Sequence, residues 1–324
     1  MSHVECKPAF NLQVLHRKSA DSKNGSLFQQ YREQWNERPR KYSCGNFPLH
    51  LDLESTSECN LRCSFCWANE MRDSGGHIER EMVQEVLKSG AEFGLRAVKF
   101  NLRGEPLMHP EIHELVRDAK QSGLVDVFFN TNGQLLNEEK AVRLIKCGLD
   151  RITISCEGSE EEQYKKFRSG ADFNAIVGNV RMLQDLKKRF GVENPLVRVQ
   201  TVRLPEIVPL LGKYLDFWKP LADEVCCTDY QDIDDSGDFG KYPWACPFIF
   251  QRMTILWDGT ILPCDRDVQM RHPLGNAREV SVHKAWTSGF MLELRDLHKA
   301  GMAHKVDMCR TCSFRVSEIR KLNA

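Results

Sequence analysis

Between residues 48 and 227, short apolar segments alternate with longer amphipathic segments, and this alternation restricts the fold more than any other feature of the sequence. Strands that alternate with helices of about 10–15 residues form parallel βα units. Six units are too few to close an eight-stranded barrel, so we predict an α/β fold with a partial (β/α)6, TIM-like barrel. In such barrels the chemistry lies at the C-terminal ends of the strands. The predicted strands cover residues 49–53, 97–101, 125–129, 151–155, 196–202 and 224–227, and the predicted helices cover residues 81–94, 111–123, 138–148, 174–189 and 208–218.

The segments outside this alternation have different patterns. Residues 1–45 are polar and irregular, with one helix predicted at 27–35. Near the C-terminus, two apolar runs flank Asp258-Gly259, which is a strong hairpin signal, and one further helix is predicted at 282–298. We therefore predict an N-terminal extension (1–45), the partial barrel (46–230) and a small C-terminal domain (231–324).

Charge and hydropathy exclude several classes of partner. The chain has 45 Lys and Arg residues and 45 Asp and Glu residues, so it has no long-range attraction to nucleic acids or anionic membranes. No apolar run reaches the roughly 18 residues of a membrane span, and the N-terminus lacks a signal-peptide pattern. We expect a cytoplasmic protein. Its 13 cysteines are then better interpreted as metal ligands or reactive thiols than as disulfides.

Three cysteines follow the first predicted strand in the pattern Cys59-x-x-x-Cys63-x-x-Cys66. Thiolates hold [4Fe–4S] clusters, and three ligands on one short loop leave the fourth iron open. A structural zinc site would need a fourth ligand, and none lies close by in the sequence. The triple therefore predicts a cluster with one open iron.

Four more cysteines lie in the C-terminal domain. Four thiolates complete either a tetrahedral zinc site or a fully ligated [4Fe–4S] cluster, and their spacing alone does not distinguish the two. These residues are Cys246, Cys264, Cys309 and Cys312.

The first cysteine pattern, with the aromatic residue Phe65 before its last cysteine, resembles that of the radical S-adenosylmethionine (SAM) superfamily. In that family SAM chelates the open iron, and its reductive cleavage gives a 5′-deoxyadenosyl radical that abstracts a substrate hydrogen. The segment 103–106 resembles the family's GGEP motif, with Arg103 in place of the first glycine. Further segments match at later strand ends. The resemblance implies that SAM is bound by Phe65, Gly104, Glu105, Pro106, Asn130, Asn132, Ser155 and Arg168.

The hairpin and the late CxxC motif of the second cysteine group resemble the SPASM/twitch class of auxiliary-cluster domains. The spacing is similar to that of 2-deoxy-scyllo-inosamine dehydrogenase. This resemblance implies a second [4Fe–4S] cluster on the four C-terminal cysteines. It also implies a small-molecule substrate and an external one-electron reductant of the flavodoxin or ferredoxin type.

Three reactions fit this resemblance. The first is dehydrogenation of an alcohol on a sugar-like or cyclitol-like molecule, with the auxiliary cluster as electron acceptor. The second is epimerisation with a cysteine as hydrogen donor, and the third is peptide modification, although residues 1–45 are short for a peptide-recognition domain. An iron–sulfur electron carrier or a zinc-stapled binding module would not need the segments around Glu105 and Arg168. The candidate catalytic residues, at the end of the last predicted strand, are Cys226, Cys227, Asp229 and Tyr230.

Overall fold

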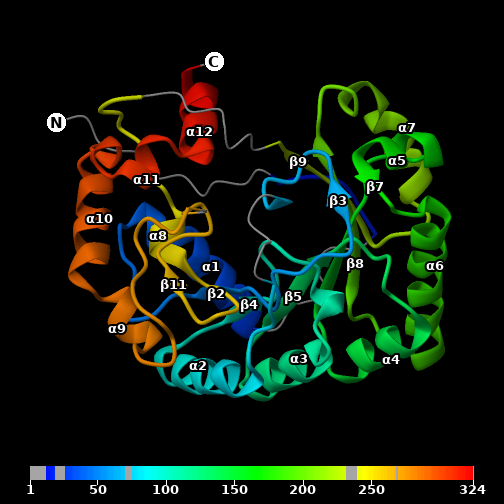
Figure 1. Ribbon diagram of the computed structural model, residues 1–324, viewed down its shortest axis with the longest axis horizontal. Helices are drawn as coiled ribbons and strands as arrows, with labels where there is room; N and C mark the ends of the chain where they lie inside the picture. Colours follow the sequence, from blue (N-terminus) through cyan, green and yellow to red (C-terminus); the bar gives the residue numbers. More distant parts are fainter. Residues whose placement is uncertain (1–11, 19–25, 70–74, 231–238, 268, 324) are drawn as a thin grey trace.

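The computed structural model describes residues 12–18, 26–69, 75–230, 239–267 and 269–323 (Figure 1). Within these residues the main sheet has nine strands in the order β1-β9-β8-β6-β5-β4-β2-β10-β11. Its six central strands are parallel neighbours, which confirms the predicted α/β class and partial barrel. They are β2 (His50–Leu53), β4 (Ala97–Lys99), β5 (Asp126–Thr131), β6 (Arg151–Ser155), β8 (Leu196–Arg203) and β9 (Glu224–Asp229).

Helices cover the outer face of the curved sheet, as Figure 1 shows for α2, α3, α4 and α6. Their ends follow capping rules: Asn137 and Asp172 accept hydrogen bonds from the first turns of α4 and α6, and Gly94 ends α2 at φ 86°. The five predicted helices are confirmed; a short helix, α5 (Glu161–Phe167), was not predicted. The outer helices are α2 (Arg80–Phe93), α3 (Ile112–Gln121), α4 (Glu138–Lys146), α6 (Phe173–Phe190) and α7 (Leu211–Trp218), the last preceded by the 3₁₀ turn η3 (Val208–Leu210).

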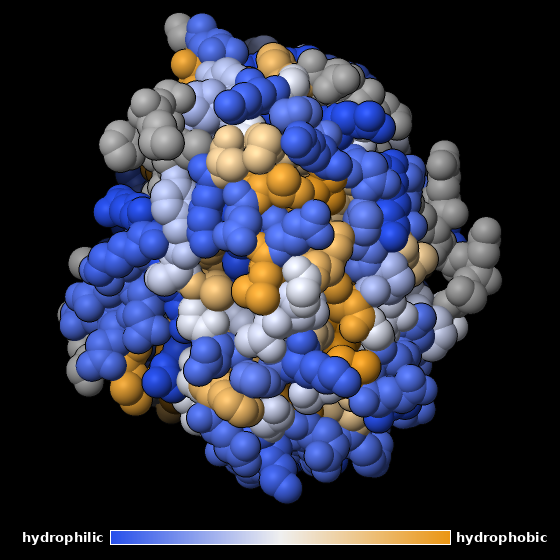
Figure 2. Space-filling view, turned by 90° about the vertical axis from the view of Figure 1, so that its left-hand side faces the viewer, coloured by the Kyte–Doolittle hydropathy of each residue, from blue (hydrophilic) through white to orange (hydrophobic). Residues whose placement is uncertain are grey.

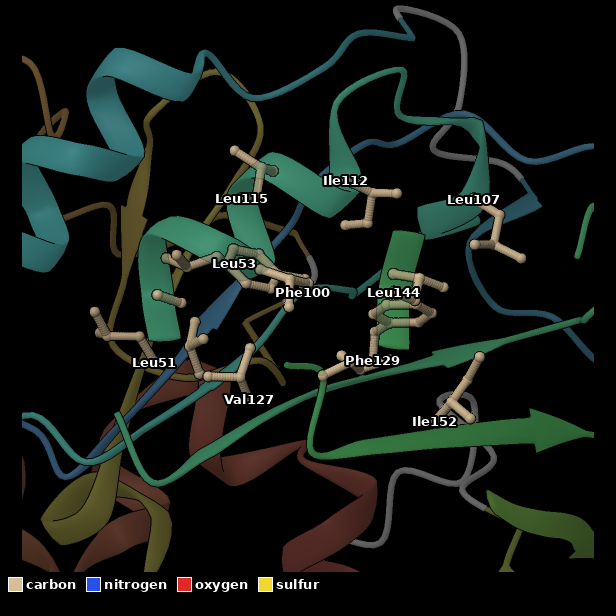
Figure 3. Packing of buried hydrophobic residues seen from close by; sticks show 14 of the residues in the cluster. Leu51, Leu53, Phe100, Leu107, Ile112, Leu115, Val127, Phe129, Leu144 and Ile152 are labelled. Atoms are coloured by element: carbon tan, nitrogen blue, oxygen red, sulfur yellow. The ribbon is translucent and has the colours of Figure 1, made fainter. Parts of the chain in front are cut away.

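The hydrophobic core lies between the sheet and these helices. Figure 3 shows Leu51 and Leu53 of β2 and Val127 and Phe129 of β5 packing toward α3 and α4. Alternate residues of a strand point to opposite faces, so the positions between these residues, Asp52 and Phe128, face the barrel lumen. Charged and polar side chains line the lumen together with aromatic and aliphatic ones.

The N-terminal extension adds a strand and a helix to the barrel. β1 (Leu12–Arg17), which was not predicted, pairs antiparallel with β9. The predicted helix is confirmed as α1 (Ser26–Arg40). Gln251 donates a hydrogen bond to the Trp35 carbonyl (2.6 Å), which ties this helix to the C-terminal domain.

The C-terminal domain is continuous with the barrel sheet. β10 (Arg252–Ile255) and β11 (Ile261–Leu262) form the predicted hairpin, and β10 also pairs in parallel with β2. The prediction of one helix at 282–298 was wrong, because Ser288 caps a new helix, so that α9 (Val282–Trp286) and α10 (Gly289–Lys299) are separate. The remaining elements are α8 (Phe248–Gln251), η4 (Ala303–Lys305), α11 (Asp307–Arg310) and α12 (Ser313–Asn323).

Figure 2 views the molecule from the side of the C-terminal domain. Hydrophilic side chains cover most of this face, and apolar side chains gather in a band down its middle. No helix among the described residues is long and apolar enough to span a membrane.

Candidate functional site

The loop after β2 carries the first three cysteines. Its short strand β3 (Arg62–Cys63) pairs antiparallel with β7 (Arg168–Ser169), which fixes the loop over the C-terminal ends of the barrel strands. The backbone N–H of Cys66 donates to the carbonyl of Cys63 (3.1 Å). Burial raises the pKa of the Cys63 thiol to about 11, and the charges of Cys59 and Cys66 contribute to this increase. Among the described residues the three thiols do not converge tightly enough to hold a metal ion, so they are spread along the loop.

The loop of the 103–106 segment packs directly against the cysteine loop. A Cβ atom on Gly104 would lie 2.1 Å from the carbonyl oxygen of Thr56 and 2.6 Å from that of Glu58, so only glycine fits. The next N–H, that of Glu105, donates to the Glu58 carbonyl (2.7 Å). This close approach explains the glycine in structural terms.

Arg103, which departs from the GGEP pattern, has a partner of its own. Its Nε and Nη2 atoms lie 2.6 and 2.5 Å from the two carboxylate oxygens of Glu54, a fully buried residue at the end of β2. Glu54 also accepts from the backbone N–H of Trp257 in the C-terminal hairpin (3.3 Å). The arginine thus joins the motif to the barrel and to the second domain.

The carboxylate of Glu105 organises the end of β5. It accepts hydrogen bonds from the Thr131 hydroxyl (2.5 Å), the Asn132 N–H (2.7 Å) and the Leu107 N–H (3.1 Å). Burial raises the pKa of Glu105, while these three donors oppose the increase. Pro106 begins the 3₁₀ helix η2 (Pro106–Met108) that follows.

Asn132 connects β5 to the cysteine loop. Its Nδ2 atom donates to Asn60 Oδ1 (2.8 Å) and lies 3.9 Å from Cys59 Sγ. Ser155 is half-buried at the end of β6, and Asn130 faces the lumen cavity. The predicted SAM contacts therefore surround one region, at the cysteine loop and the adjoining strand ends.

Arg168 is buried beside the same loop. Its Nε and Nη2 atoms bind both carboxylate oxygens of Glu157, and its Nη1 atom lies 3.6 Å from Cys63 Sγ. Its guanidinium carbon lies 5.7 Å from the ring centre of Phe65. Burial opposes the charge of Arg168, but Glu157 and Cys63 raise its pKa above the ordinary value. The guanidinium is thus a fixed positive charge next to Cys63, a predicted cluster ligand.

The four C-terminal cysteines line one pocket, together with Trp244, Phe248 and Phe314. Among the described residues no group of Cys, His, Asp and Glu side chains converges tightly enough to hold a metal ion, so the thiols surround the pocket instead of meeting at a point. A fully ligated four-iron cluster needs one thiolate for each iron. Four cysteines around one apolar pocket fit that requirement.

His298 makes hydrogen-bond contacts with two of these cysteines. Its Nδ1 atom accepts from the backbone N–H of Cys246 (3.1 Å), so its proton is on Nε2, which lies 3.4 Å from Cys309 Sγ. Burial lowers the pKa of His298 to about 3, and the charge of Arg315 contributes. The neutral ring is therefore a hydrogen-bond donor to the sulfur of Cys309.

The candidate catalytic residues of β9 lie on different faces. Glu224 and Thr228 line the lumen cavity, so Cys226 between them faces the lumen and Cys227 faces the opposite side. Both thiols are buried. The carboxylate of Asp229 is held by Arg203 (3.0 Å) and Lys321 (2.8 Å). Tyr230 is exposed at the end of the strand.

Two family models match this arrangement of sites. The model described as "Radical SAM superfamily" matches residues 53–206, a range that contains the first three cysteines. The model described as "Iron-sulfur cluster-binding domain", SPASM, matches residues 246–313, which contain the other four. The chain contains a radical SAM domain followed by an iron–sulfur SPASM domain. The predicted family is thereby confirmed, and the two domains imply [4Fe–4S] chemistry and SAM binding.

Curated relatives of this radical SAM protein have different names. The "Tungsten-containing aldehyde ferredoxin oxidoreductase cofactor-modifying protein" of Pyrococcus furiosus is 24% identical over 315 residues, covering 82% of this chain and 87% of that protein. A "Probable GTP 3′,8-cyclase" of Methanococcus maripaludis is 33% identical over 125 residues, or 38% of this chain. That alignment spans 41% of the cyclase, less than half of its length.

Solved structures share the fold of the radical SAM protein. BtrN in complex with AdoMet and 2-DOIA has a TM-score of 0.55 at 18% identity, covering 83% of this chain and 94% of BtrN. Streptococcus suis SuiB bound to precursor peptide SuiA has a TM-score of 0.65 at 16% identity, covering 93% of this chain and 77% of SuiB. At these identities the likeness shows the fold alone.

Several residues of the radical SAM site were not found from the sequence. Glu54 and Glu157 hold the two arginines, and Thr131 holds Glu105. Each of these residues lies at or just after the C-terminal end of a predicted strand, which is the signal that could have indicated them. His298 carries no such signal, because it lies within a helix.

Proposed function

We propose that this radical SAM enzyme dehydrogenates an alcohol carbon of a small, sugar-like or cyclitol-like molecule. The observation that carries the proposal is the pair of thiol sites: three cysteines at the barrel strand ends and four around a pocket of the C-terminal domain. When bound, the first cluster and SAM supply hydrogen-atom abstraction, and the auxiliary cluster supplies an electron acceptor. The alcohol loses one hydrogen atom, one proton and one electron, which balances its two-electron oxidation.

The residues of the chain have distinct parts in this proposal. Cys59, Cys63 and Cys66 would hold the first cluster, and the buried Arg168 keeps a positive charge beside Cys63. Gly104 lets the next segment approach the cysteine loop closely. Glu105 and Asn132 would shape the SAM site through their hydrogen bonds to the end of β5 and to the cysteine loop. Asn130 and Ser155 would contact SAM from the lumen side. The lumen itself is the substrate chamber.

The proton of the alcohol needs an acceptor at the same end of the barrel. Asp229 is the last residue of β9 and Tyr230 follows it, and Asp229 is fixed by ion pairs with Arg203 and Lys321. These contacts place its carboxylate near the junction of β8, β9 and α12. We propose Asp229 or Tyr230 as the acceptor; Asp229 shares the β9 face of Cys227, so its carboxylate would reach the substrate over the end of the strand.

Epimerisation is the second candidate function, because the fully buried Cys226 lies between the lumen-lining Glu224 and Thr228 and shares their face of β9, although its own side chain does not line the cavity. A thiol in this position can return a hydrogen atom to the face opposite the one from which it was removed. Cys227, on the other face of β9, lacks access to the lumen. The orientation of the strand therefore favours Cys226 as the hydrogen donor for this reaction.

The first experiment tests the class of chemistry. Anaerobically reconstituted protein, SAM and dithionite should yield 5′-deoxyadenosine, and protein lacking the cysteine triple (C59A/C63A/C66A) should yield none. Absence of 5′-deoxyadenosine from the wild-type protein would refute the enzyme proposal.

The second experiment separates the two reactions once a turned-over substrate is in hand. In deuterated water, dehydrogenation gives a product two mass units lighter with no carbon-bound deuterium. Epimerisation through a thiol installs one deuterium on carbon, and C226A abolishes this incorporation while the matched variant C227A retains it. Deuterium incorporation that persists in C226A would contradict the assignment of the donor.

A further inference from the structure

The lumen contains a cavity of about 450 Å³ that neither cysteine site occupies. Phe28, Tyr31 and Trp35 of α1 form its floor, at the N-terminal ends of the strands. At the other end it reaches Asn130 and Thr228, near the strand ends where SAM is expected. The N-terminal extension thus closes the bottom of the chamber.

Positive charge dominates the cavity wall. Only two carboxylates, Asp126 and Glu224, are among the described residues that line it. Two further carboxylates, Asp52 and Asp265, are not among the described residues that line the cavity, and they bind Lys99 (3.2 Å) and Arg252 (2.5 Å), respectively. The cationic residues of the wall are Arg17, Arg32, Lys99, Arg151, Arg198 and Arg252.

Arg151 and Arg198 are neighbours on adjacent strands. Arg151 pairs in register with Leu196, and Arg198 lies two residues further along the same lumen-facing side of β8. One carboxylate, Glu224, is shared between Arg198 (2.6 Å) and Arg17 (2.6 Å). After burial, the charge of Arg151 is the largest cause that lowers the pKa of Arg198. Glu224 therefore neutralises Arg198 only in part, because it also pairs with Arg17.

The guanidinium of Arg151 has weak ionic and hydrogen-bond pairing for a cation that lines a cavity. Its contact with Asp126 is long, at 3.4 Å, and its guanidinium lies over the ring of Phe128, 3.8 Å from the ring centre. Among the described residues its buried Nε atom has no hydrogen-bond partner. Cations that are removed from water without full pairing are unfavourable, and a guanidinium fork binds a carboxylate or phosphate through two hydrogen bonds.

We propose that Arg151 and Arg198 bind an anionic group of the substrate, a phosphate or a carboxylate. This inference rests on the proposed function, in which the lumen is the substrate chamber. The anionic group lies near the α1 floor, so the rest of the molecule extends toward Asn130 and the cysteine loop. The substrate is accordingly an anionic sugar-like or cyclitol-like molecule, and a cationic amino sugar is excluded by like charge.

The test measures anion binding by isothermal titration calorimetry on anaerobically reconstituted protein. The probes are inorganic phosphate, pyrophosphate, malonate and glucosamine, at constant ionic strength with chloride as the reference. We expect at least one anion to bind with a stoichiometry near one, and glucosamine to show no binding. Binding of phosphate or pyrophosphate alone identifies a phosphate group, and binding of malonate alone identifies a carboxylate.

Variants locate the site. R151Q and R198Q should each weaken anion binding at least ten-fold, and R151K should weaken it because it keeps the charge but loses the fork. R189Q is the matched control, because Arg189 is an exposed arginine in an ion pair with Glu138. Thermal unfolding of the wild-type protein with and without pyrophosphate gives a readout that needs no variant.

Two outcomes overturn the inference: no anion binds the wild-type protein more tightly than chloride, or R151Q and R198Q fold and keep wild-type affinity. Both outcomes are independent of 5′-deoxyadenosine formation by the wild-type protein. If the protein cleaves SAM but binds no anion, the inference of an anionic substrate is refuted and the proposed function is not. If the protein binds anions at Arg151 but does not cleave SAM, the proposed function is refuted and the anion site is not.

Discussion

The Nη1 atom of Arg168 lies 3.6 Å from the sulfur of Cys63, while the other two nitrogens of its guanidinium hold Glu157. Glu157 is fully buried and Arg168 nearly so. The pair therefore places one fixed positive charge beside Cys63, a predicted cluster ligand, and neutralises it on its far side.

Replacing Arg168 by Gln should have two separable effects. The uncompensated Glu157 should lower the free energy of unfolding by about 3–5 kcal/mol. Loss of the positive charge should also lower the reduction potential of the first cluster, because the reduced cluster carries more negative charge. Urea unfolding measures the first effect and an EPR-monitored redox titration the second.

The double variant R168Q/E157Q is the control for this prediction. It removes both buried charges, so much of the lost stability should return, and the potential should rise from that of R168Q but stay below that of the wild type, because the positive charge nearer the sulfur is still missing. A double variant that is as unstable as R168Q would contradict the charge argument.

Substituting Gly104 by Ala should disrupt the first cluster. The new Cβ would clash with two backbone carbonyl oxygens of the cysteine loop, those of Thr56 and Glu58. Backbone atoms cannot move aside as side chains can, so the loop must shift. We expect G104A to lose most of the iron and sulfide of the first site, measured by chemical assay after reconstitution.

A helical glycine gives a matched comparison. Gly178 in α6 has nothing within 4 Å of an added Cβ, and G178A should keep its iron and gain up to about 1 kcal/mol of stability. Equal iron contents in G104A and G178A would show that the close approach has no role in cluster binding.

His298 should tune the auxiliary cluster. H298F removes both the acceptor for the Cys246 N–H and the donor to Cys309 Sγ. An N–H donor to a ligand sulfur stabilises the reduced cluster, so H298F should lower the auxiliary potential. The unsatisfied N–H should also cost about 1–3 kcal/mol of stability.

Conservative and distant variants complete this test. H298Q can keep part of the hydrogen bonding and should lie between H298F and the wild type. H283F, at the half-buried His283 that stacks on Phe93, should leave the potential unchanged. An unchanged potential in H298F would remove His298 from the surroundings of the cluster.

Iron counts should separate the two cysteine sites. Two [4Fe–4S] clusters correspond to about eight irons per chain, and C59A/C63A/C66A should retain about four. C309A/C312A should likewise retain about four, all in the site that binds SAM. Zinc in the C-terminal site, detected by mass spectrometry of the metal content, would contradict the two-cluster proposal.

The sequence alone was sufficient for features that depend on short spacings. The period of the hydrophobic pattern predicted the barrel strands and the outer helices, and the Asp258-Gly259 turn predicted the hairpin. Cys59, Cys63 and Cys66 lie on one loop, so their spacing fixes their proximity. These features involve neighbouring residues, and local geometry limits them to few arrangements.

Only the tertiary structure decided which distant residues meet. Cys63 and Arg168 are 105 positions apart, and their contact depends on the pairing of β3 with β7. The direction in which the sheet curls decides that Cys226, and not Cys227, faces the lumen. The same curvature gathers Arg151 and Arg198 on the lumen wall. Strand alternation separates the two faces of a strand in the sequence, but only the closure of the sheet around the lumen determines which face becomes the inside.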